Sequence, residues 1–379
     1  MDFTFSEDQI AFRDSISRFL MTEAAPEHLR DIWETQSGHA PELWARLAEQ
    51  GLLGLSVPEA EGGMGMNDID WALLLQETGY YALPDCVTDT AYVAVGMLAA
   101  LPPEHPVRVR WLPRIAAGKC CVAVGHPLNL HVLGAATADL LLLPHRTEAG
   151  LELHAVLPAD CRITPLRSLD SSRRLCQVQW TPGAATLILD GASGAAVWRQ
   201  AGLRGALAAS AQLVGLAQRM LDLSVDYAAQ RKQFDRAIGS FQAVQHHLAD
   251  IVTRVEFAKP VLYRAFYALQ HGEPEAALRV SHAKLQCGEA GWFAARNGLQ
   301  VHGAMGYTWE VDLQMFMKRA WALDAAWGDR AHHSGNLATG LLEGEHPPIG
   351  PGHTFDRQDV GAAGQAVPVR QAVPEEVAA

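Results

Sequence analysis

The chain has 379 residues, which is enough for two or three domains that share buried cores. Its formal charge of −12 argues against nucleic acid and anionic membrane surfaces as partners, because both bind basic protein faces. No apolar stretch approaches the ~20 residues of a membrane span. The acidic start Met1–Gln9 also lacks the basic and apolar segments of a secretory signal. We therefore expect a soluble, cytoplasmic protein without a membrane span.

The cysteines and histidines do not predict a metal site. None of the cysteines forms a C-x-x-C pair, and Cys120 and Cys121 are adjacent. The histidine pairs His246–His247 and His332–His333 are neighbours in sequence, whereas ligands on a helix are spaced one turn apart. Reduced thiols and surface imidazoles account for this pattern.

Residues 1–118 are predicted to be helical. Ser6 can cap a helix in a capping-box arrangement, because Gln9 follows three residues later. Pro41 occupies a favoured first-turn position of another helix. A further apolar segment, roughly residues 85–101, stops at two consecutive prolines.

The sequence pattern changes from helical to β-like in residues 119–197, which predicts a small middle β domain. Short β-like runs are each bounded by Gly, Pro, Asp or Thr. Five such runs are expected to be strands: residues 120–125, 138–144, 151–158, 175–180 and 185–190.

Helical patterns return in residues 198–342, which predict a domain of the four-helix type. The run Ala208–Ala228 is apolar almost all round, as in a helix buried on several sides. Pro260 is expected to kink or interrupt the helix that follows. Later helices are expected over residues 274–299 and 313–338. Residues 343–379 are rich in Pro, Gly and Ala and are expected to be a disordered tail.

Two runs in the second half carry a family resemblance: residues 227–242 (YAAQRKQFDRAIGSFQ) and residues 299–309 (LQVHGAMGYTW). In the first, a helix ends, the chain makes a tight turn at Gly239, and another helix begins. Together they resemble the C-terminal helical domain of the acyl-CoA dehydrogenase family, which is FAD-dependent. Weaker matches precede them: residues 5–20, 51–65 and 111–119. The resemblance implies an α+β, mainly α fold, with an N-terminal helical domain, a small middle β domain and a C-terminal helical bundle.

The resemblance also implies a set of FAD-binding residues. In the family these two segments grip an FAD that is bound mainly by a neighbouring subunit. A guanidinium can hold a pyrophosphate by two parallel charged hydrogen bonds, and a small side chain allows close approach. The cofactor-binding residues implied are Arg231, Phe234, Gln242, Gln300, Gly303 and Ala304.

Other interpretations of the same residues stay open. Arg231 fits a solvated cation at a helix end, Phe234 a core residue, and Gly303 a helix cap. Two positions also depart from the family pattern, which usually has glycine at Asp235 and at Ala304. An acid at Asp235 is unfavourable beside a pyrophosphate unless it points away.

The base that the family's chemistry requires is missing. The reaction removes a proton next to a thioester carbonyl, and the family places a glutamate for this at one of two sites. The first region, Ala195–Ser210, contains no acid. At the second, before Gly328, the glutamate position holds Trp327, and an indole is no base. Asp324 and Asp329 are weak substitutes, and ordinary helix acids are the simpler interpretation.

The middle domain departs as well. Residues 122–143 (VAVGHPLNLHVLGAATADLLLL) lack the Thr-Glu-Pro and Gly-Ser-Asp patterns that embrace the flavin ring in the family. With residues 168–175 (SLDSSRRL), the chain resembles the base-lacking subunit of bacterial α2β2 acyl-CoA dehydrogenases that shorten steroid side chains.

That resemblance implies three partners. They are an acyl-CoA substrate with a steroid or fatty acyl group, a related chain that carries the catalytic glutamate, and an electron-transfer acceptor. Two alternatives remain: a self-sufficient homotetramer with an Asp324 or Asp329 base, and a non-catalytic scaffold of the same fold.

Overall fold

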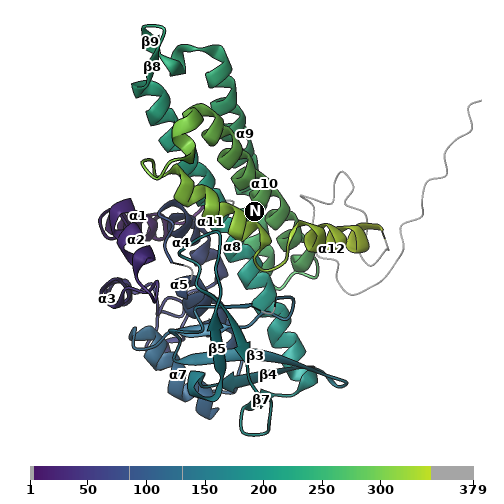
Figure 1. The fold of residues 1–379 in the computed structure, drawn as a ribbon. Helices are drawn as coiled ribbons and strands as arrows, with labels where there is room; N and C mark the ends of the chain where they lie inside the picture. The colour runs from purple at the N-terminus through teal and green to yellow at the C-terminus, as the bar shows by residue number, and fades with distance from the viewer. Residues whose placement is uncertain (1–3, 85, 130, 343–379) are drawn as a thin grey trace, which may run out of the picture.

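The computed structural model describes residues 4–84, 86–129 and 131–342. Helices at the start of the chain are followed by small sheets and then by long helices, as Figure 1 shows from purple through blue to yellow-green. The expected mainly α fold, with a small β part between two helical parts, is confirmed. The predicted tail, residues 343–379, lies outside the described residues. No helix among the described residues is long and apolar enough to cross a membrane.

Short helices make up the first part of the chain and share one hydrophobic core with the long helices of the last part. Ser6 caps the first of them, and its capping box with Gln9 forms as expected. Pro41 opens α3 as expected. The apolar segment near residue 90 is helical but contains a π-helical stretch, η2. The elements are α1 (Glu7–Glu23), α2 (Pro26–Glu34), α3 (Pro41–Glu49), η1 (Glu59–Glu61), α4 (Asp68–Tyr80), α5 (Cys86–Thr88), η2 (Asp89–Ala94), α6 (Val95–Ala99) and α7 (Pro106–Ala116).

The middle part forms two sheets with a small apolar core of their own. One has the order β1-β3-β4-β7, with β1 parallel to β3 and the other pairs antiparallel; the other has the antiparallel order β2-β6-β5. All five expected runs contain a strand, and β2 and β5 are additional. The strands are β1 (Val122–Val124), β2 (His131–Leu133), β3 (Leu140–Thr147), β4 (Gly150–Val156), β5 (Arg162–Pro165), β6 (Leu175–Gln179) and β7 (Leu187–Leu189), with a short turn η3 (Pro158–Asp160).

Long helices make up the last part. The central helix, α8, begins at Gly191, where Asp190 accepts a hydrogen bond from Ser193 N at 2.9 Å. Figure 1 shows α8 running from the sheets to the far end of the molecule, where β8 and β9 lie. The elements are α8 (Gly191–Gln230), β8 (Lys232–Gln233), β9 (Arg236–Ala237), η4 (Ile238–Ser240), α9 (Gln242–Gln270), α10 (Ala276–His302), η5 (Gly303–Tyr307), α11 (Leu313–Ala325) and α12 (Arg330–Leu342).

Two expectations for these helices are corrected. Helix α9 continues through Pro260, so the expected alternative of an interruption is wrong. The single helix expected over residues 313–338 is two helices, because Trp327 and Gly328 have φ angles of 57° and 99° that no α-helix accommodates. This break creates the turn between α11 and α12 that carries Trp327.

Candidate functional site

The segments expected to bind FAD meet at one end of the helical bundle. The ring of Tyr227, near the end of α8, stacks on that of His302, the last residue of α10, with centroids 4.4 Å apart. This contact brings the residues that follow each helix to the same end, beside β8 and β9 in Figure 1. The structure exposes all six of the expected residues: Arg231, Phe234, Gln242, Gln300, Gly303 and Ala304.

A hairpin turn that was not expected precedes Gly239. Strands β8 and β9 pair Lys232 with Ala237 and leave Phe234 and Asp235 as a two-residue turn. Both residues have positive φ, 52° and 62°. This geometry is that of a type I′ hairpin turn, which favours Asn-Gly. The tight turn expected at Gly239 is present as the 3-10 turn η4, where Phe241 N donates to the Ile238 carbonyl oxygen at 3.1 Å.

Phe234 is not a core residue, because 87% of its surface is exposed. It contacts Phe241 edge to face, with ring centroids 6.2 Å apart. The left-handed backbone at Phe234 costs energy in a non-glycine residue. The hairpin therefore presents an aromatic ring to the outside of the chain.

Gly303 is the C-cap of α10, as one of the interpretations held. Its φ of 58° and ψ of −137° lie in a region that only glycine adopts readily. No heavy atom lies within 4 Å of the position a Cβ would take there. The backbone at Gly303 is therefore open to a group approaching from outside.

These residues fit a pyrophosphate and adenosine. The Arg231 guanidinium is exposed and has no ion-pair partner among the described residues, so its donors are available. The Gln242 and Gln300 amides are also exposed and can donate or accept. The site lies at the surface of this chain, as a cofactor shared with another chain requires.

At the second site, Trp327 stands in the expected base position, and its side chain lies against α8. A Cβ built on Gly205 would lie 2.1 Å from the indole ring, so the ring packs directly on the glycine backbone. Gly205 lies within the first region where the family places its glutamate. The two base regions thus meet in space, and neither provides a carboxylate at that contact.

Buried groups hold the turn that carries Trp327. Lys284 donates from Nζ to the carbonyl oxygens of Asp324, at 2.7 Å, and Gly328, at 3.3 Å. Nε2 of His333 lies 3.1 Å from the Trp327 carbonyl oxygen, and its Nδ1 lies 3.1 Å from Ser281 Oγ. Burial lowers the pKa of Lys284 to about 8 and that of His333 to about 4.

Trp327 borders a cavity of about 690 Å³ between the sheets and the helices. The described residues that line it include no carboxylate; their ionisable groups are Arg146, Arg199 and three histidines. One of the histidines, His126, packs edge to face against Trp327, with ring centroids 4.7 Å apart. Burial lowers the pKa of His126 to about 4, and His332 contributes. The cavity is polar at the histidines, and along α8 it is apolar except at Arg199.

The two aspartates considered as substitute bases lie elsewhere. A Cβ on Gly288 of α10 would lie 2.2 Å from Asp324 Oδ1, so this carboxylate faces α10. Asp329 is exposed and accepts a hydrogen bond from His332 N at 2.8 Å. Neither borders the Trp327 cavity, and neither forms an ion pair among the described residues.

Sequence reasoning missed three residues that shape this region: Gly205, His126 and Lys284. His126 was visible only as part of a run that lacks the family pattern. The buried Lys284 lies mid-helix in α10, where a lysine is ordinarily a solvated residue. Their roles depend on contacts between segments far apart in sequence, which no local pattern records.

Comparison with protein families gives two matches. Residues 6–119 match the description "Acyl-CoA dehydrogenase, N-terminal domain", and residues 192–342 match "Acyl-CoA dehydrogenase, C-terminal domain". The sheets between them account for most of the unmatched residues before the end of α12.

Individual relatives match most of the chain. It is 30% identical over 318 residues to acyl-CoA dehydrogenase IpdE2 of Mycolicibacterium smegmatis, covering 83% of this chain and 93% of the relative. It is 27% identical over 339 residues to acyl-CoA dehydrogenase FadE27 of Mycobacterium tuberculosis, covering 81% and 89%. A chain of the ChsE4-ChsE5 complex from Mycobacterium tuberculosis shares the fold, with a TM-score of 0.81 and 24% identity over 92% of this chain and 100% of that one. The chain therefore belongs to the acyl-CoA dehydrogenase family of FAD-dependent oxidoreductases that act on CH–CH bonds.

Proposed function

We propose that this chain is the base-lacking subunit of a heteromeric, α2β2 acyl-CoA dehydrogenase. The observation that carries the proposal is the packing of the Trp327 indole on Gly205, which fills the meeting point of the family's two base regions without a carboxylate. Asp324 and Asp329 lie outside that cavity. A related chain would supply the glutamate and so the proton abstraction.

The exposed residues at the β8–β9 end of the helical bundle, here called the cofactor end, support the proposal that FAD is shared with a partner chain. Arg231, Gln242 and Gln300 would hold the pyrophosphate and adenosine of an FAD seated mainly on the partner chain. FAD supplies the hydride acceptor of the family's reaction when bound. A cofactor shared between chains makes assembly necessary for activity. The ChsE4-ChsE5 neighbour is itself a complex of two chains, which supports assembly with a related chain.

The acyl group and the redox partner belong to the same proposal. From the sequence resemblance we propose a steroid or fatty acyl-CoA substrate, and an electron-transfer protein that reoxidises the flavin. We place the enzyme in the cytoplasm. We also propose the unit boundaries 1–118, 119–197 and 198–342 for its helical, β and helical parts.

Flavin content measured by visible absorbance tests the shared site. The protein purified alone is expected to hold little FAD and to be inactive. Co-expression with a glutamate-bearing relative is expected to restore both FAD and acyl-CoA oxidation. One FAD per chain and activity in the isolated protein would contradict the proposal and favour a self-sufficient enzyme. A complex that assembles without FAD or activity would favour a scaffold.

Arg231→Ala in the heteromer tests the donor role of this chain. Removing a charged hydrogen-bond partner costs about 1.5–3 kcal/mol, so FAD is expected to bind about 10- to 150-fold more weakly. Lys232→Ala is the matched control, because Lys232 is the next exposed cation along β8. Unchanged FAD affinity and turnover in the Arg231 variant would show that the arginine is only a solvated helix-end cation.

A further inference from the structure

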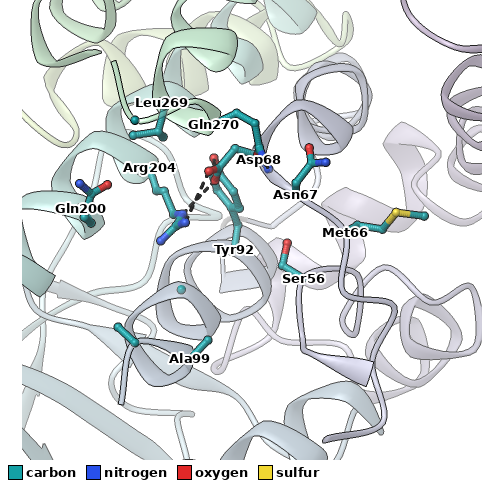
Figure 2. A pocket seen from close by; sticks show the side chains of 13 residues that line it. Ser56, Met66, Asn67, Asp68, Tyr92, Ala99, Gln200, Arg204, Leu269 and Gln270 are labelled. Atoms are coloured by element: carbon teal, nitrogen blue, oxygen red, sulfur yellow. Dashed lines mark hydrogen bonds and ion pairs between the residues drawn. The ribbon is translucent and has the colours of Figure 1, made fainter. Parts of the chain in front are cut away.

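A second cavity, of about 500 Å³, lies apart from the Trp327 cavity (Figure 2). It lies among the start of α4, the segments η2 and α6, helix α8 and the end of α9. Helix α8 separates the two cavities: Gln200 and Arg204 line this one, whereas Arg199 and Leu203 line the other. No residue lines both cavities.

A closed ion pair forms one wall. Arg204 Nε donates to Asp68 Oδ1 at 2.9 Å, and its Nη2 lies 3.4 Å from Asp68 Oδ2. The hydroxyl of the buried Tyr92 donates to the same Oδ1 at 2.8 Å. The Asp68 carboxylate is therefore already occupied by donors from α8 and η2, as the dashed lines in Figure 2 show for Arg204.

Two side chains of the cavity wall have hydrogen-bond donors that a ligand can use. Nε and Nη2 of Arg204 bond the Asp68 carboxylate, whereas Nη1 makes no hydrogen bond to it among the described residues. It lies close to the Gly96 backbone, where a Cβ would be only 2.4 Å away, so this glycine gives the guanidinium its space. The Gln270 amide accepts from Asp68 N at 2.8 Å through Oε1, which leaves its nitrogen free to donate. An oxygen acceptor is the matching group.

The charge and the volume of the cavity restrict the class of ligand that it can bind. Among the described residues that line the cavity, only Arg204 and Asp68 are formally charged, and they neutralise each other. A carboxylate or phosphate would add a negative charge beside Asp68 without a second cation, which is unfavourable at low dielectric. Part of the wall is apolar, from Leu269, Met66 and Ala99. The rest carries uncharged polar side chains: Ser56, Asn67, Tyr92, Gln200 and Gln270. The volume is in the range of small-molecule sites.

We propose that this cavity binds a neutral small molecule through a carbonyl oxygen that accepts a hydrogen bond from Nη1 of Arg204. The inference does not rest on the proposed function, because no lining residue belongs to the cofactor end or to the Trp327 turn. A bicyclic ketone is the appropriate probe for the size of the cavity.

Saturation-transfer NMR on the full-length protein tests the site, with 1-decalone as the probe and decalin-1-carboxylate as its anionic analogue. Only the ketone is expected to bind. Arg204→Lys keeps a cation beside Asp68 but removes Nη1, and is expected to raise the ketone Kd about tenfold, as for the loss of one hydrogen bond. Ala99→Phe fills the cavity without touching the ion pair and is expected to abolish binding.

Arg296→Lys is the matched control, because Arg296 is an exposed arginine on α10 that only stacks on Trp292. It is expected to bind the ketone as the unchanged protein does. Thermal unfolding of each variant separates loss of binding from loss of fold. Failure of the unchanged protein to bind 1-decalone would mean a cavity filled by water alone and would overturn the proposal. So would equal binding by Arg204→Lys, or tighter binding of the carboxylate.

Discussion

At the scale of single residues, Trp327 and Gly205 form a complementary pair. The indole occupies the space that a side chain at position 205 would need, since a Cβ there would approach the ring to 2.1 Å. Real carbon contacts do not become that short, so any larger residue at 205 must displace the ring. Trp327 lies in a turn with positive φ, and hydrogen bonds from Lys284 and His333 hold the backbone of this turn. The ring therefore has few alternative positions.

Gly205→Ala is therefore expected to lower the free energy of unfolding by about 1–3 kcal/mol, the usual cost of overpacking a core. Urea denaturation followed by circular dichroism measures this change. Gly202→Ala is the matched control on the same helix, because no heavy atom lies within 4 Å of its Cβ position. It is expected to be neutral or stabilising by up to ~1 kcal/mol, since alanine favours helix. Equal effects of both substitutions would contradict the packing.

The buried histidine of the Trp327 turn predicts a pH dependence of stability. Burial, with Lys284 nearby, lowers the pKa of His333 to about 4 from an ordinary 6.5. Between these values the unfolded chain binds more protons than the folded one, so the free energy of unfolding decreases as pH falls from about 6.5 towards 4. Above pH 6.5 the histidine is neutral in both states, and it no longer lowers the free energy of unfolding.

His333→Gln is expected to make that decrease shallower, because the substituted side chain does not titrate. Urea midpoints at a series of pH values between 4 and 7.5 measure the slope. His246→Gln, at an exposed position on α9, is the control and is expected to leave the slope unchanged. An identical slope in the His333 variant would show that other groups cause the acid sensitivity.

At the scale of elements, the β8–β9 hairpin combines two residues that are poorly suited to their backbone. Type I′ turns need positive φ at both central positions, which Asn-Gly supplies at low cost. This chain has Phe234 and Asp235 there, with φ of 52° and 62°. Asp235 is exposed, so its carboxylate can remain in water beside the proposed cofactor end.

Asp235→Gly is expected to raise the free energy of unfolding by about 0.5–1 kcal/mol, because glycine adopts the left-handed region without the Cβ penalty. Chemical denaturation measures the gain. Asp235→Ala is the matched comparison, since it removes the same carboxylate but keeps a Cβ and so gains nothing. A gain of the same size with alanine would attribute the effect to charge rather than to backbone strain.

The two turns explain where the sequence patterns were insufficient. The hairpin turn at Phe234 and Asp235 was not expected, because glycine is the ordinary marker of a tight turn, whereas Phe234 is not. The break at Trp327 was not expected because the residues on both sides continue a helical pattern. In both places a non-glycine residue has positive φ, which local propensity disfavours and tertiary contacts must stabilise.

At the scale of the whole molecule, the order of helices, sheets and helices was predictable. Its motifs are local: a capping box at Ser6, short β runs in the middle and a long apolar helix around residues 208–228. The pairing of Asp68 with Arg204 was not predictable, because these residues are 136 positions apart and each resembles an ordinary helix charge on its own. Residues far apart in sequence meet at both cavities: Asp68 with Arg204 at one, and His126 with Trp327 at the other.

A buried charge cluster joins the three parts of the chain. Arg319 of α11 forms an ion pair with Asp170 and donates to Ser172, both in the middle part. Its Nη1 donates to the Leu83 carbonyl oxygen of the first part at 2.7 Å. Arg319 and Asp170 are 1% and 0% exposed. Burial opposes ionisation of Asp170, but Arg319 beside it lowers its pKa overall.

Removing one partner of this cluster is expected to destabilise the whole molecule. Arg319→Ala leaves Asp170 buried without its cation and is expected to lower the free energy of unfolding by about 3–5 kcal/mol. The double variant Arg319→Met with Asp170→Leu removes both charges and is expected to recover much of that loss, because apolar replacements of buried pairs are often neutral. The recovery, measured as a coupling energy in a double-mutant cycle, is the direct test. Since the cluster contacts all three parts, probes in each part are expected to report the same loss in urea. If the double variant is as unstable as Arg319→Ala, the cost comes from lost packing rather than from an unpaired charge, and the ion pair does not hold the parts together.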